Sequence, residues 1–405
     1  MTKIALVSPC ILPLPNVRGG GVELLIQYFI ELNEINHDFD LTVFSIKDFK
    51  AIRESKKYLF TKFVYIENEF FLFKYIKSTI SKYILKLFKV LLIFRSKYIK
   101  QIDKYLFTND FDKLIVENCH EFLISSQNNL NCDKYYHIHF NDFRPDCKTK
   151  MKELQTNAVK GYKRIVCISE FIKKQVEKTT GQYNTVLLNN CIDTRKFTQI
   201  SKAEKDKLQD KYQISDDDIV ILYSGRIISE KGILELILAF KKLCNNYPLK
   251  LLIVGAGTYS LNSNTTFIRK LKSLVSNIKE KVIFTGYIEH SEIHKIYNLC
   301  DFTVIPTLYC EEAAGLVAIE ALASGKPVII SDSGGLPEYV NEDCSICVNR
   351  NKDFIFGLEQ AIETLINNKD LRIIMGIEAI KLSKKFDMEE YYNNYKKILF
   401  DKGII

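Results

Sequence analysis

The residues best suited to chemistry are two glutamates, Glu312 and Glu320, which have seven residues between them and flank Gly315. The stretch that begins at Gly315 is rich in alanine and leucine and favours a helix. The first turn of a helix offers unpartnered backbone N–H groups and the positive end of the helix dipole, so a phosphate group can bind at the amides of Gly315, Leu316 and Val317. Glu312 would then face neutral hydroxyl groups beside that phosphate, and Glu320 would face a second pair of hydroxyl groups.

The elements that must position these residues are a strand, a helix and a second strand. Residues 302–306 form a short apolar run typical of a buried strand, and the helix is expected over residues 313–324. Gly325 stands where a left-handed C-cap belongs, and Pro327 stops the helix before a second apolar strand. Two glutamates on a helix are usually surface carboxylates, so the pattern gains its weight from the glycine at the helix start and the stop signals that accompany it.

A second pair of residues, Arg226 and Lys231, follows an apolar run over residues 219–223 that is expected to be a strand. Arginine presents a forked set of donors and lysine a compact point charge, and together they suit a diphosphate at the end of a strand. An arginine and a lysine on an exposed turn would carry little weight alone. Together with the glutamates downstream, they favour a binding role.

These segments resemble the signature of the GT4 family of retaining glycosyltransferases. In that family two glutamates with seven residues between them flank a glycine at a helix entrance, and a Gly-Arg…Lys-Gly pattern holds the leaving nucleoside diphosphate. The resemblance implies an α/β chain with the GT-B fold, in which two Rossmann-like domains with doubly wound parallel sheets face a central cleft. It covers nearly the whole chain, densely over residues 219–340 and sparsely over residues 45–135.

The resemblance also implies roles for single residues. Glu312 would hold hydroxyl groups of the donor sugar, Glu320 would hold the ribose, and the backbone around Tyr287 would read the nucleobase. Ala313 with Ala314, and Cys191, depart from residues that are frequent in the family. No metal ion or other cofactor is expected. The residues expected to be catalytic are His139, Arg226, Lys231 and Glu312. The residues expected to bind the donor are Gly20, Gly21, Arg226, Lys231, Tyr287, Glu312, Ala314, Gly315, Leu316, Val317 and Glu320.

Two of the six histidines, His137 and His139, stand at the end of a strand expected over residues 135–138. In open α/β sheets ligands gather at the carboxyl ends of the strands. His139 resembles the histidine with which the first domain of the family contacts the donor sugar, and His137 is the alternative for that role. A His-x-His pair can also bind a metal ion, but the sequence shows no carboxylate or cysteine beside it that would complete a ligand set.

Three short motifs suggest other functions weakly. The glycines at residues 19–21 lead into a helix but lack the GxGxxG spacing of a dinucleotide site, and Gly255 and Gly257 lack the third glycine. Residues 216–218 contain a DxD, which binds a nucleotide-sugar through a divalent cation in the other major glycosyltransferase fold. Here it lies in a polar linker expected over residues 198–218, so we interpret it as a solvated acidic turn.

The chain of 405 residues, with 47% hydrophobic and 26% charged residues, has the composition of a globular protein with more than one domain. Strand-like runs alternate with helical stretches, which favours doubly wound sheets. We expect an acceptor-side domain over residues 1–197, a nucleotide-sugar-binding domain over residues 198–385, and a C-terminal helix over residues 386–405 that packs back on the first domain. The eleven cysteines, an odd number without a framework, are expected to be reduced thiols.

The net charge of +8 comes from one segment. Residues 70–105 hold nine lysines and arginines against one acid, Asp103, and apolar residues recur in it every three or four positions. This pattern indicates amphipathic helix with a basic face, which either docks on an anionic membrane surface or covers the first sheet with solvated lysines. No nucleic-acid motif accompanies it, so no nucleic acid is expected. No signal peptide or membrane-spanning run is visible, so the expected location is cytoplasmic, with peripheral contact at the inner face of the membrane as an open alternative.

Together these features predict a retaining glycosyltransferase. It would move a hexosyl unit from a UDP-hexose or a UDP-N-acetylhexosamine to a hydroxyl of a glycan or lipid-linked saccharide, in the assembly of a bacterial surface polysaccharide. Three alternatives stay open. One is a GT-B sugar-nucleotide epimerase, one is a nicotinamide-dependent dehydrogenase that rests on Gly255 and Gly257 alone, and one is a non-catalytic membrane-associated scaffold that rests on the basic segment alone.

Overall fold

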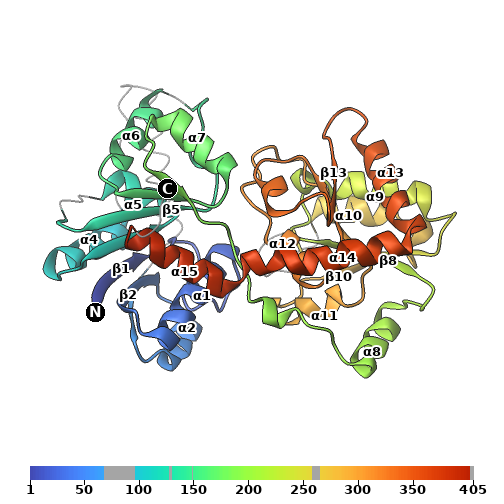
Figure 1. Cartoon of the computed structure of the whole chain (residues 1–405), viewed down its shortest axis with the longest axis horizontal. Coiled ribbons are helices and arrows are strands. Elements are labelled where there is room, and N and C mark those ends of the chain that lie inside the picture. The colour runs from blue at the N-terminus through green and yellow to red at the C-terminus, as the bar shows by residue number, and fades with distance from the viewer. Residues whose placement is uncertain (68–95, 127–129, 148, 258–264, 402–405) are drawn as a thin grey trace. The chain divides into compact units, whose positions relative to one another are not determined.

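The computed structural model describes residues 1–67, 96–126, 130–147, 149–257 and 265–401. They form two compact units, which are coloured in sequence order in Figure 1. One unit is Met1–Asn189 with Tyr392–Ile405, and the other is Asn190–Tyr391. Each unit is built on one parallel sheet with helices packed against it. The prediction of two Rossmann-like α/β domains is therefore confirmed.

The sheet of the first unit has seven strands in the order β3-β2-β1-β4-β5-β6-β7, and all its neighbouring strands are parallel. Strands β2 and β3 follow on one side of β1, and strands β4 to β7 follow on its other side. In open α/β sheets, ligands generally bind at the carboxyl ends of the strands, at the point where the strand order reverses. In this sheet the order reverses between β1 and β4. The strands are β1 Thr2–Val7, β2 Phe39–Ile46, β3 Thr61–Ile66, β4 Lys113–Glu117, β5 Asp133–Ile138, β6 Arg164–Cys167 and β7 Thr185–Leu187.

The last helix of the chain packs on the first unit beside its first helix (Figure 1). The ring of Phe29 lies 5.3 Å from that of Tyr392 and 5.2 Å from that of Tyr395, between ring centroids. Through these buried rings the last helix and the first helix share one apolar core. The helices are α1 Gly21–Asn36, α2 Phe49–Glu54, α4 Lys97–Thr108, α5 His120–Ser125, α6 Thr149–Val159, α7 Glu170–Thr180 and α15 Met388–Leu399.

The sheet of the second unit has six parallel strands in the order β10-β9-β8-β11-β12-β13, so its order reverses between β8 and β11. Its strands β8 and β12 are largely buried and mostly apolar, as expected for a parallel sheet covered on both faces. The strands are β8 Ile219–Ser224, β9 Leu249–Val254, β10 Val282–Gly286, β11 Phe302–Ile305, β12 Val328–Ser331 and β13 Ser345–Val348.

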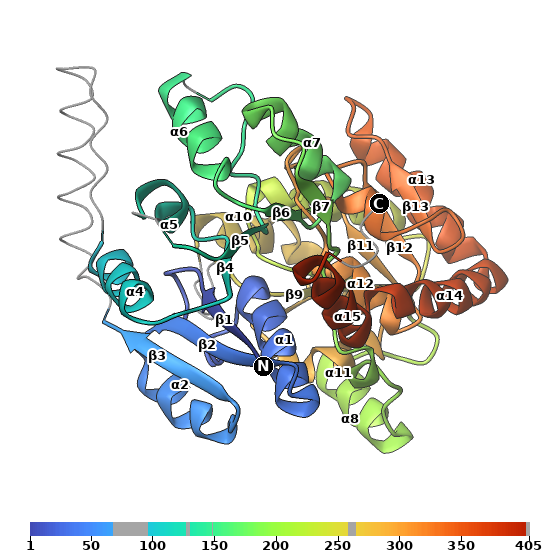
Figure 2. The same cartoon turned by 60° about the vertical axis from the view of Figure 1, so that its left-hand side comes forward.

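The helices of the second unit include two that pack closely, α12 and α14, which lie side by side in Figure 2. The close approach occurs at Gly376, where an added Cβ would lie 2.5 Å from the carbonyl O of Gly325. Gly325 has a φ of +66°, which confirms the predicted left-handed cap after the helix. The helices are α8 Lys202–Tyr212, α9 Ile233–Leu243, α10 Thr266–Leu274, α11 Ile293–Tyr297, α12 Leu316–Ala323, α13 Phe354–Asn367 and α14 Lys369–Ser383.

The polar segment after residue 197 is not the continuous linker that the sequence suggested, because α8 forms within it. Ser201 is its N-cap and accepts a hydrogen bond from the N–H of Glu204 at 3.3 Å. The spacing Ser-x-x-Glu is a capping-box signal that could have predicted this helix. The sequence also missed β7 and β13, which are short edge strands of three and four residues without a distinct apolar pattern.

Most of the predicted basic helix lies outside the described residues, and its last part is α4. Within α4 the side chains of Tyr98, Ile99 and Ile102 are buried, whereas Lys100 and Lys104 are exposed. This helix therefore covers the unit with its apolar face and turns its lysines to solvent. In the part of the chain that is described, no helix combines the length and the apolar character that crossing a bilayer demands. All eleven cysteines are free thiols.

Candidate functional site

The predicted arginine lies on the loop that leaves the carboxyl end of β8. Gly225 has a φ of +144°, and the exposed Arg226 follows it. The hydroxyl of Tyr223 donates a hydrogen bond to the carbonyl O of Arg226 at 2.7 Å. A Cβ on Gly255, at the end of β9, would lie 1.8 Å from the carbonyl O of Gly225. Gly255 is thus explained by the close packing of two turns, and the dehydrogenase alternative loses its main support.

Lys231 lies at the far end of the same loop and forms an ion pair with Glu312. The Nζ of Lys231 is 2.5 Å from Oε2 of Glu312, and the two side chains are 25% and 16% exposed. Thr307 donates its hydroxyl to the same carboxylate oxygen at 3.2 Å. The structure therefore brings together two predicted residues that are 81 positions apart, at the carboxyl ends of the neighbouring strands β8 and β11.

Backbone contacts hold the loops after β8 and β11 together. The carbonyl O of Glu230 accepts hydrogen bonds from the N–H of Leu308 at 2.9 Å and from the N–H of Tyr309 at 3.1 Å. Gly232 has a φ of +68°, and an added Cβ there would lie 1.8 Å from the carbonyl O of Pro306. The side chains of Lys231 and Glu312 therefore project from backbone that is fixed on both sides.

The loop after β12 fixes the backbone of Glu312 from its other side. The N–H of Gly335 donates to the carbonyl O of Glu312 at 2.7 Å, and a Cβ on Gly334 would lie 2.2 Å from that oxygen. Ser331 and Ser333 donate their hydroxyls to the carbonyl O of Thr307 at 2.7 and 2.8 Å. Three loops from adjacent strands thus form one rigid edge.

Helix α12 begins at Leu316, three residues after the start expected from the sequence, because Gly315 caps it. Gly315 is its N-cap residue, and the carbonyl O of Gly315 accepts a hydrogen bond from the N–H of Ala318 at 3.0 Å. The amides of Gly315, Leu316 and Val317 lie ahead of this first hydrogen bond, where a helix offers N–H groups to an anion. Ala314 packs partly buried against the apolar cluster below.

Glu320 lies farther along α12 and is 6% exposed. Tyr297 donates its hydroxyl to Oε2 at 3.0 Å, and Nε2 of His290 lies 3.1 Å from Oε1. Burial opposes protonation of His290, but the hydrogen bond and the charge of Glu320 outweigh it and raise the pKa of the imidazole. A carboxylate accepts about four hydrogen bonds, so two partners leave capacity for the predicted hydroxyl groups.

Tyr287, the predicted neighbour of the nucleobase, follows the carboxyl end of β10, and its hydroxyl donates to Glu289 at 3.4 Å. A cavity of about 450 Å³ opens elsewhere, at the amino ends of the strands, and its lining includes Asp301, Lys326 and Arg372. The cavity lies at the edge of the sheet opposite to the carboxyl ends of the strands, where the donor site is predicted, so we do not assign the donor to it.

In the first unit, Gly20 and Gly21 lie where the chain enters α1. Gly20 has a φ of +116°, and an added Cβ would lie 2.2 Å from Oε2 of Glu23. Glycine therefore lets the loop pass over a carboxyl group that is only 4% exposed. Burial raises the pKa of Glu23 to about 7, although a backbone hydrogen bond acts in the opposite direction.

Replacement of Glu23 by glutamine is expected to stabilise the chain above pH 7. Because the pKa of Glu23 in the folded chain lies above its ordinary value of 4.5, the folded state keeps a proton that the unfolded state has released. The free energy of unfolding of the wild type should therefore fall by about 3 kcal/mol between pH 4.5 and pH 7. Urea unfolding should show that the free energy of unfolding of Glu23→Gln rises relative to that of the wild type between pH 4.5 and pH 7. Below pH 4.5 the difference between the two should stay constant.

The matched control is Glu31→Gln on the same helix, whose side chain accepts a hydrogen bond from Gln27. It should follow the pH profile of the wild type. A constant difference between Glu23→Gln and the wild type from pH 4.5 to pH 8 would contradict the assigned cause.

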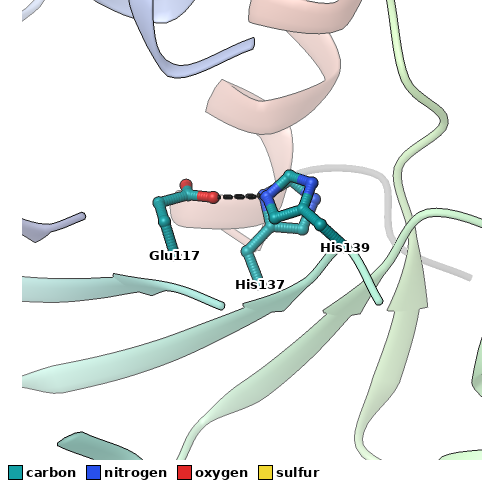
Figure 3. A group of neighbouring side chains, drawn as sticks. All are labelled: Glu117, His137 and His139. Carbon is teal, nitrogen blue, oxygen red and sulfur yellow. Dashed lines mark hydrogen bonds and ion pairs between the residues drawn. The ribbon is translucent and has the colours of Figure 1, made fainter. Parts of the chain in front are cut away.

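The two histidines singled out in the sequence both face Glu117, at the end of β4 (Figure 3). Nε2 of His139 lies 2.7 Å and Nδ1 of His137 lies 3.0 Å from Oε2 of Glu117, and all three side chains are buried. Burial favours the neutral form of Glu117, but the attraction of His137 and the hydrogen bonds of both imidazoles hold the pKa of this carboxyl well below its usual range. Burial and the charge of His137 lower the pKa of His139 to about 4.

Sequence reasoning missed Glu117, which supplies the carboxylate that the His-x-His pair lacked. The usable signal was its position, because Glu117 and His137 end neighbouring strands and are paired in register. Sequence reasoning also missed Thr307 and His290, which orient the two glutamates of the second unit. Thr307 lies five positions before Glu312 in the loop that follows β11, whereas His290 follows β10 and lies 30 positions before Glu320.

Comparisons with known proteins bear on the second unit first. A sequence model described as "Glycosyl transferases group 1" matches residues 204–382. Within this segment the chain is similar to the glycosyl transferases group 1 family. The match includes Arg226, Lys231, Glu312 and Glu320, the polar residues of the edge described above.

Curated relatives align with part of the chain. The lipopolysaccharide 1,2-N-acetylglucosaminetransferase of Salmonella typhimurium is 31% identical over 218 residues, which cover 53% of this chain and 52% of that protein. The capsular polysaccharide biosynthesis glycosyltransferase CapM of Staphylococcus aureus is 31% identical over 250 residues, which cover 58% of this chain and 62% of that protein. The chain thus spans about half the length of the first curated relatives that it matches.

A comparison with solved structures addresses the architecture. A crystal structure of Anabaena Alr3699/HepE in complex with UDP aligns with a TM-score of 0.76 at 16% identity, over 99% of this chain and all of that chain. At this identity the likeness shows the fold alone. The chain has the GT-B fold, as its sequence predicted.

Proposed function

We propose that this chain is a retaining glycosyltransferase. It moves a hexosyl unit from a UDP-linked sugar to a hydroxyl of a glycan or lipid-linked saccharide in bacterial polysaccharide assembly. The observation that carries the proposal is the meeting of Lys231, Glu312 and the amino end of α12 at one edge of the second sheet. The names of the Salmonella and Staphylococcus relatives support a saccharide acceptor, and the Anabaena structure with UDP supports a uridine donor.

The proposed chemistry follows from where negative charge develops. As the bond between sugar and diphosphate breaks, charge grows on the departing diphosphate. Fixed donors aimed at that charge stabilise the transition state more than the ground state, and this difference accelerates the reaction. Arg226, Lys231 and the amides at the start of α12 are such donors in this proposal. They supply the positive charge, so the transfer is proposed to need no metal ion.

Glu312 has a different part in the proposed reaction. Its carboxylate accepts hydrogen bonds only, so it suits the hydroxyl groups of the donor sugar rather than the phosphates. Thr307 and the fixed backbone of residues 331–335 hold it in place. The proposed role of Glu320 is to bind the ribose, with Tyr297 and His290 orienting its carboxylate.

Thermal unfolding in the presence of nucleotides tests the donor class. A ligand at about one hundred times its Kd stabilises the native state by about 2.7 kcal/mol, so true donors should raise the Tm. UDP, UDP-glucose and UDP-N-acetylglucosamine are the probes, uridine is the control without phosphates, and GDP is the control with another base. We expect a shift with UDP and at least one UDP-sugar and none with uridine. No shift with any nucleoside diphosphate would refute the proposed function, and a larger shift with GDP would refute the uridine assignment.

A further inference from the structure

We propose that Glu117 is a positioning residue that holds His139 ready to accept a hydrogen bond from a sugar hydroxyl. The inference rests on the proposed function, because it takes the ligand of His139 to be a hydroxyl of the donor or of the acceptor. It goes beyond that function by assigning a residue that no motif of the sequence indicates. The argument uses contacts within the first unit alone.

The contact between Glu117 and His139 determines which ring nitrogen carries the proton. Nε2 of His139 lies 2.7 Å from Oε2 of Glu117. An ionised carboxylate only accepts hydrogen bonds, so Nε2 must donate. The low pKa of His139, about 4, keeps the ring neutral near pH 7, and a neutral ring protonated at Nε2 has its lone pair on Nδ1.

The other ring nitrogen of His139, Nδ1, is a hydrogen-bond acceptor. Nδ1 is buried and has no hydrogen-bond partner within the ranges that the structure describes. Buried polar atoms are nearly always satisfied by protein, water or ligand. A hydroxyl group is a donor that fits this lone pair, whereas a phosphate or carboxylate oxygen is not.

The residue after Glu117 fixes the backbone of the same histidine. Oδ1 of Asn118 accepts hydrogen bonds from the N–H of His139 at 2.6 Å and of Phe140 at 3.1 Å. Its Nδ2 donates to Asp142 at 3.2 Å, and Asn118 itself has a φ of +43°. Glu117 thus orients the ring of His139 while Asn118 orients its main chain, from two consecutive positions at the end of β4.

The carboxylate of Glu117 is itself held on both oxygens. Tyr395 on α15 donates its hydroxyl to Oε1 at 2.9 Å, and the two imidazoles share Oε2. The last helix of the chain therefore supports the orientation of Glu117. Two histidines and a carboxylate can also form a metal site, so the experiment must separate the two arrangements.

Glu117→Gln is the decisive variant, because a glutamine can turn its amide NH₂ toward His139 and reverse the tautomer. Nitrogen NMR of ¹⁵N-histidine-labelled protein should place the proton on Nε2 in the wild type and on Nδ1 in the variant. Turnover of UDP-glucose and UDP-N-acetylglucosamine, measured as UDP release, should fall about 100-fold, as expected when a contact group is misplaced. The Kd for UDP should stay within about twofold, since no contact to the second unit is altered.

Two further variants serve as controls. Tyr395→Phe removes one hydrogen bond to Oε1 and leaves Oε2 in place, so it should keep the tautomer and lose at most about fivefold in turnover. Glu177→Gln removes a carboxylate that accepts the hydroxyl of Thr185 elsewhere in the same unit, and it should change neither readout. Loss of donor hydrolysis in Glu117→Gln would place the hydroxyl on the donor. Loss only when an alcohol acceptor is added would place it on the acceptor.

Three results would overturn the inference. The first is a proton on Nδ1 of His139 in the wild type, which can be read even if Glu117→Gln fails to fold. The second is unchanged turnover in Glu117→Gln. The third is a stoichiometric divalent metal ion in the purified wild type that Glu117→Gln no longer holds. If the wild type binds no UDP, the proposed function fails by itself, and the tautomer still decides how His139 is held.

Discussion

Lys231→Met is expected to lower kcat with a UDP-sugar about 10³-fold and to weaken UDP binding, while the chain still folds. The Nζ of Lys231 lies beside Glu312 at the carboxyl edge of the second sheet, where the proposed diphosphate binds. A hydrogen bond to a charged group contributes about 1.5–3 kcal/mol, and loss of one donor to a developing charge lowers kcat by about 10²–10³-fold. Methionine keeps a similar aliphatic chain, so packing changes little.

The measurement is kcat and KM for UDP release, with the Kd for UDP from calorimetry. Lys242→Met is the matched control, because Lys242 also forms an ion pair, with Glu359 at 2.8 Å, and lies on α9 of the same unit. Its kcat should stay within about twofold of the wild type, as expected for an exposed surface pair. Equal losses in both variants would mean that Lys231 acts through stability and not through the diphosphate.

The loops at the carboxyl edge of the second sheet could be predicted from the sequence because each contains a short local pattern. Gly325 ends α12 with a φ of +66°, which few other residues adopt. Gly315 begins the helix where an added Cβ would lie 2.5 Å from a side-chain carbon of Leu336. Arg226 and Lys231 follow the end of one apolar strand by two and seven positions in the sequence. The alternation of strands and helices then places all these loops at the carboxyl edge of one sheet.

The contacts that tie these residues together could not be predicted in this way. The ion pair of Lys231 with Glu312 joins loops 81 positions apart, and the pair of Glu117 with His139 joins strand ends 22 positions apart. Such pairs depend on strand order and register, which a single sequence does not determine. The same reason explains Tyr395, which reaches Glu117 from 278 positions away.

Glu312→Ala is expected to lose turnover about 10²–10³-fold and yet to bind UDP at least as tightly as the wild type. UDP lacks the hexosyl group of the donor, so it offers none of the hydroxyl groups that the proposal assigns to Glu312. The carboxylate lies 2.5 Å from Nζ of Lys231 and competes with a diphosphate for that charge. Like charges a few ångströms apart also repel, by about 1 kcal/mol in water and more at a partly buried site. Removing the carboxylate therefore helps the leaving group to bind while it removes the contact to the sugar.

Calorimetry with UDP and with the preferred UDP-sugar separates these two effects. In Glu312→Ala the gain in affinity that the sugar contributes should disappear, whereas Lys231→Met should weaken both ligands alike. Glu311→Ala is the control, because it removes a carboxylate from the adjacent position, where Tyr309 donates to it at 3.0 Å. If Glu312→Ala and Lys231→Met weaken UDP to the same extent, the ion pair acts as one structural unit. The separate roles of sugar binding and diphosphate binding would then have to be abandoned, because only an opposite effect on UDP distinguishes a residue that meets the sugar from one that meets the phosphates.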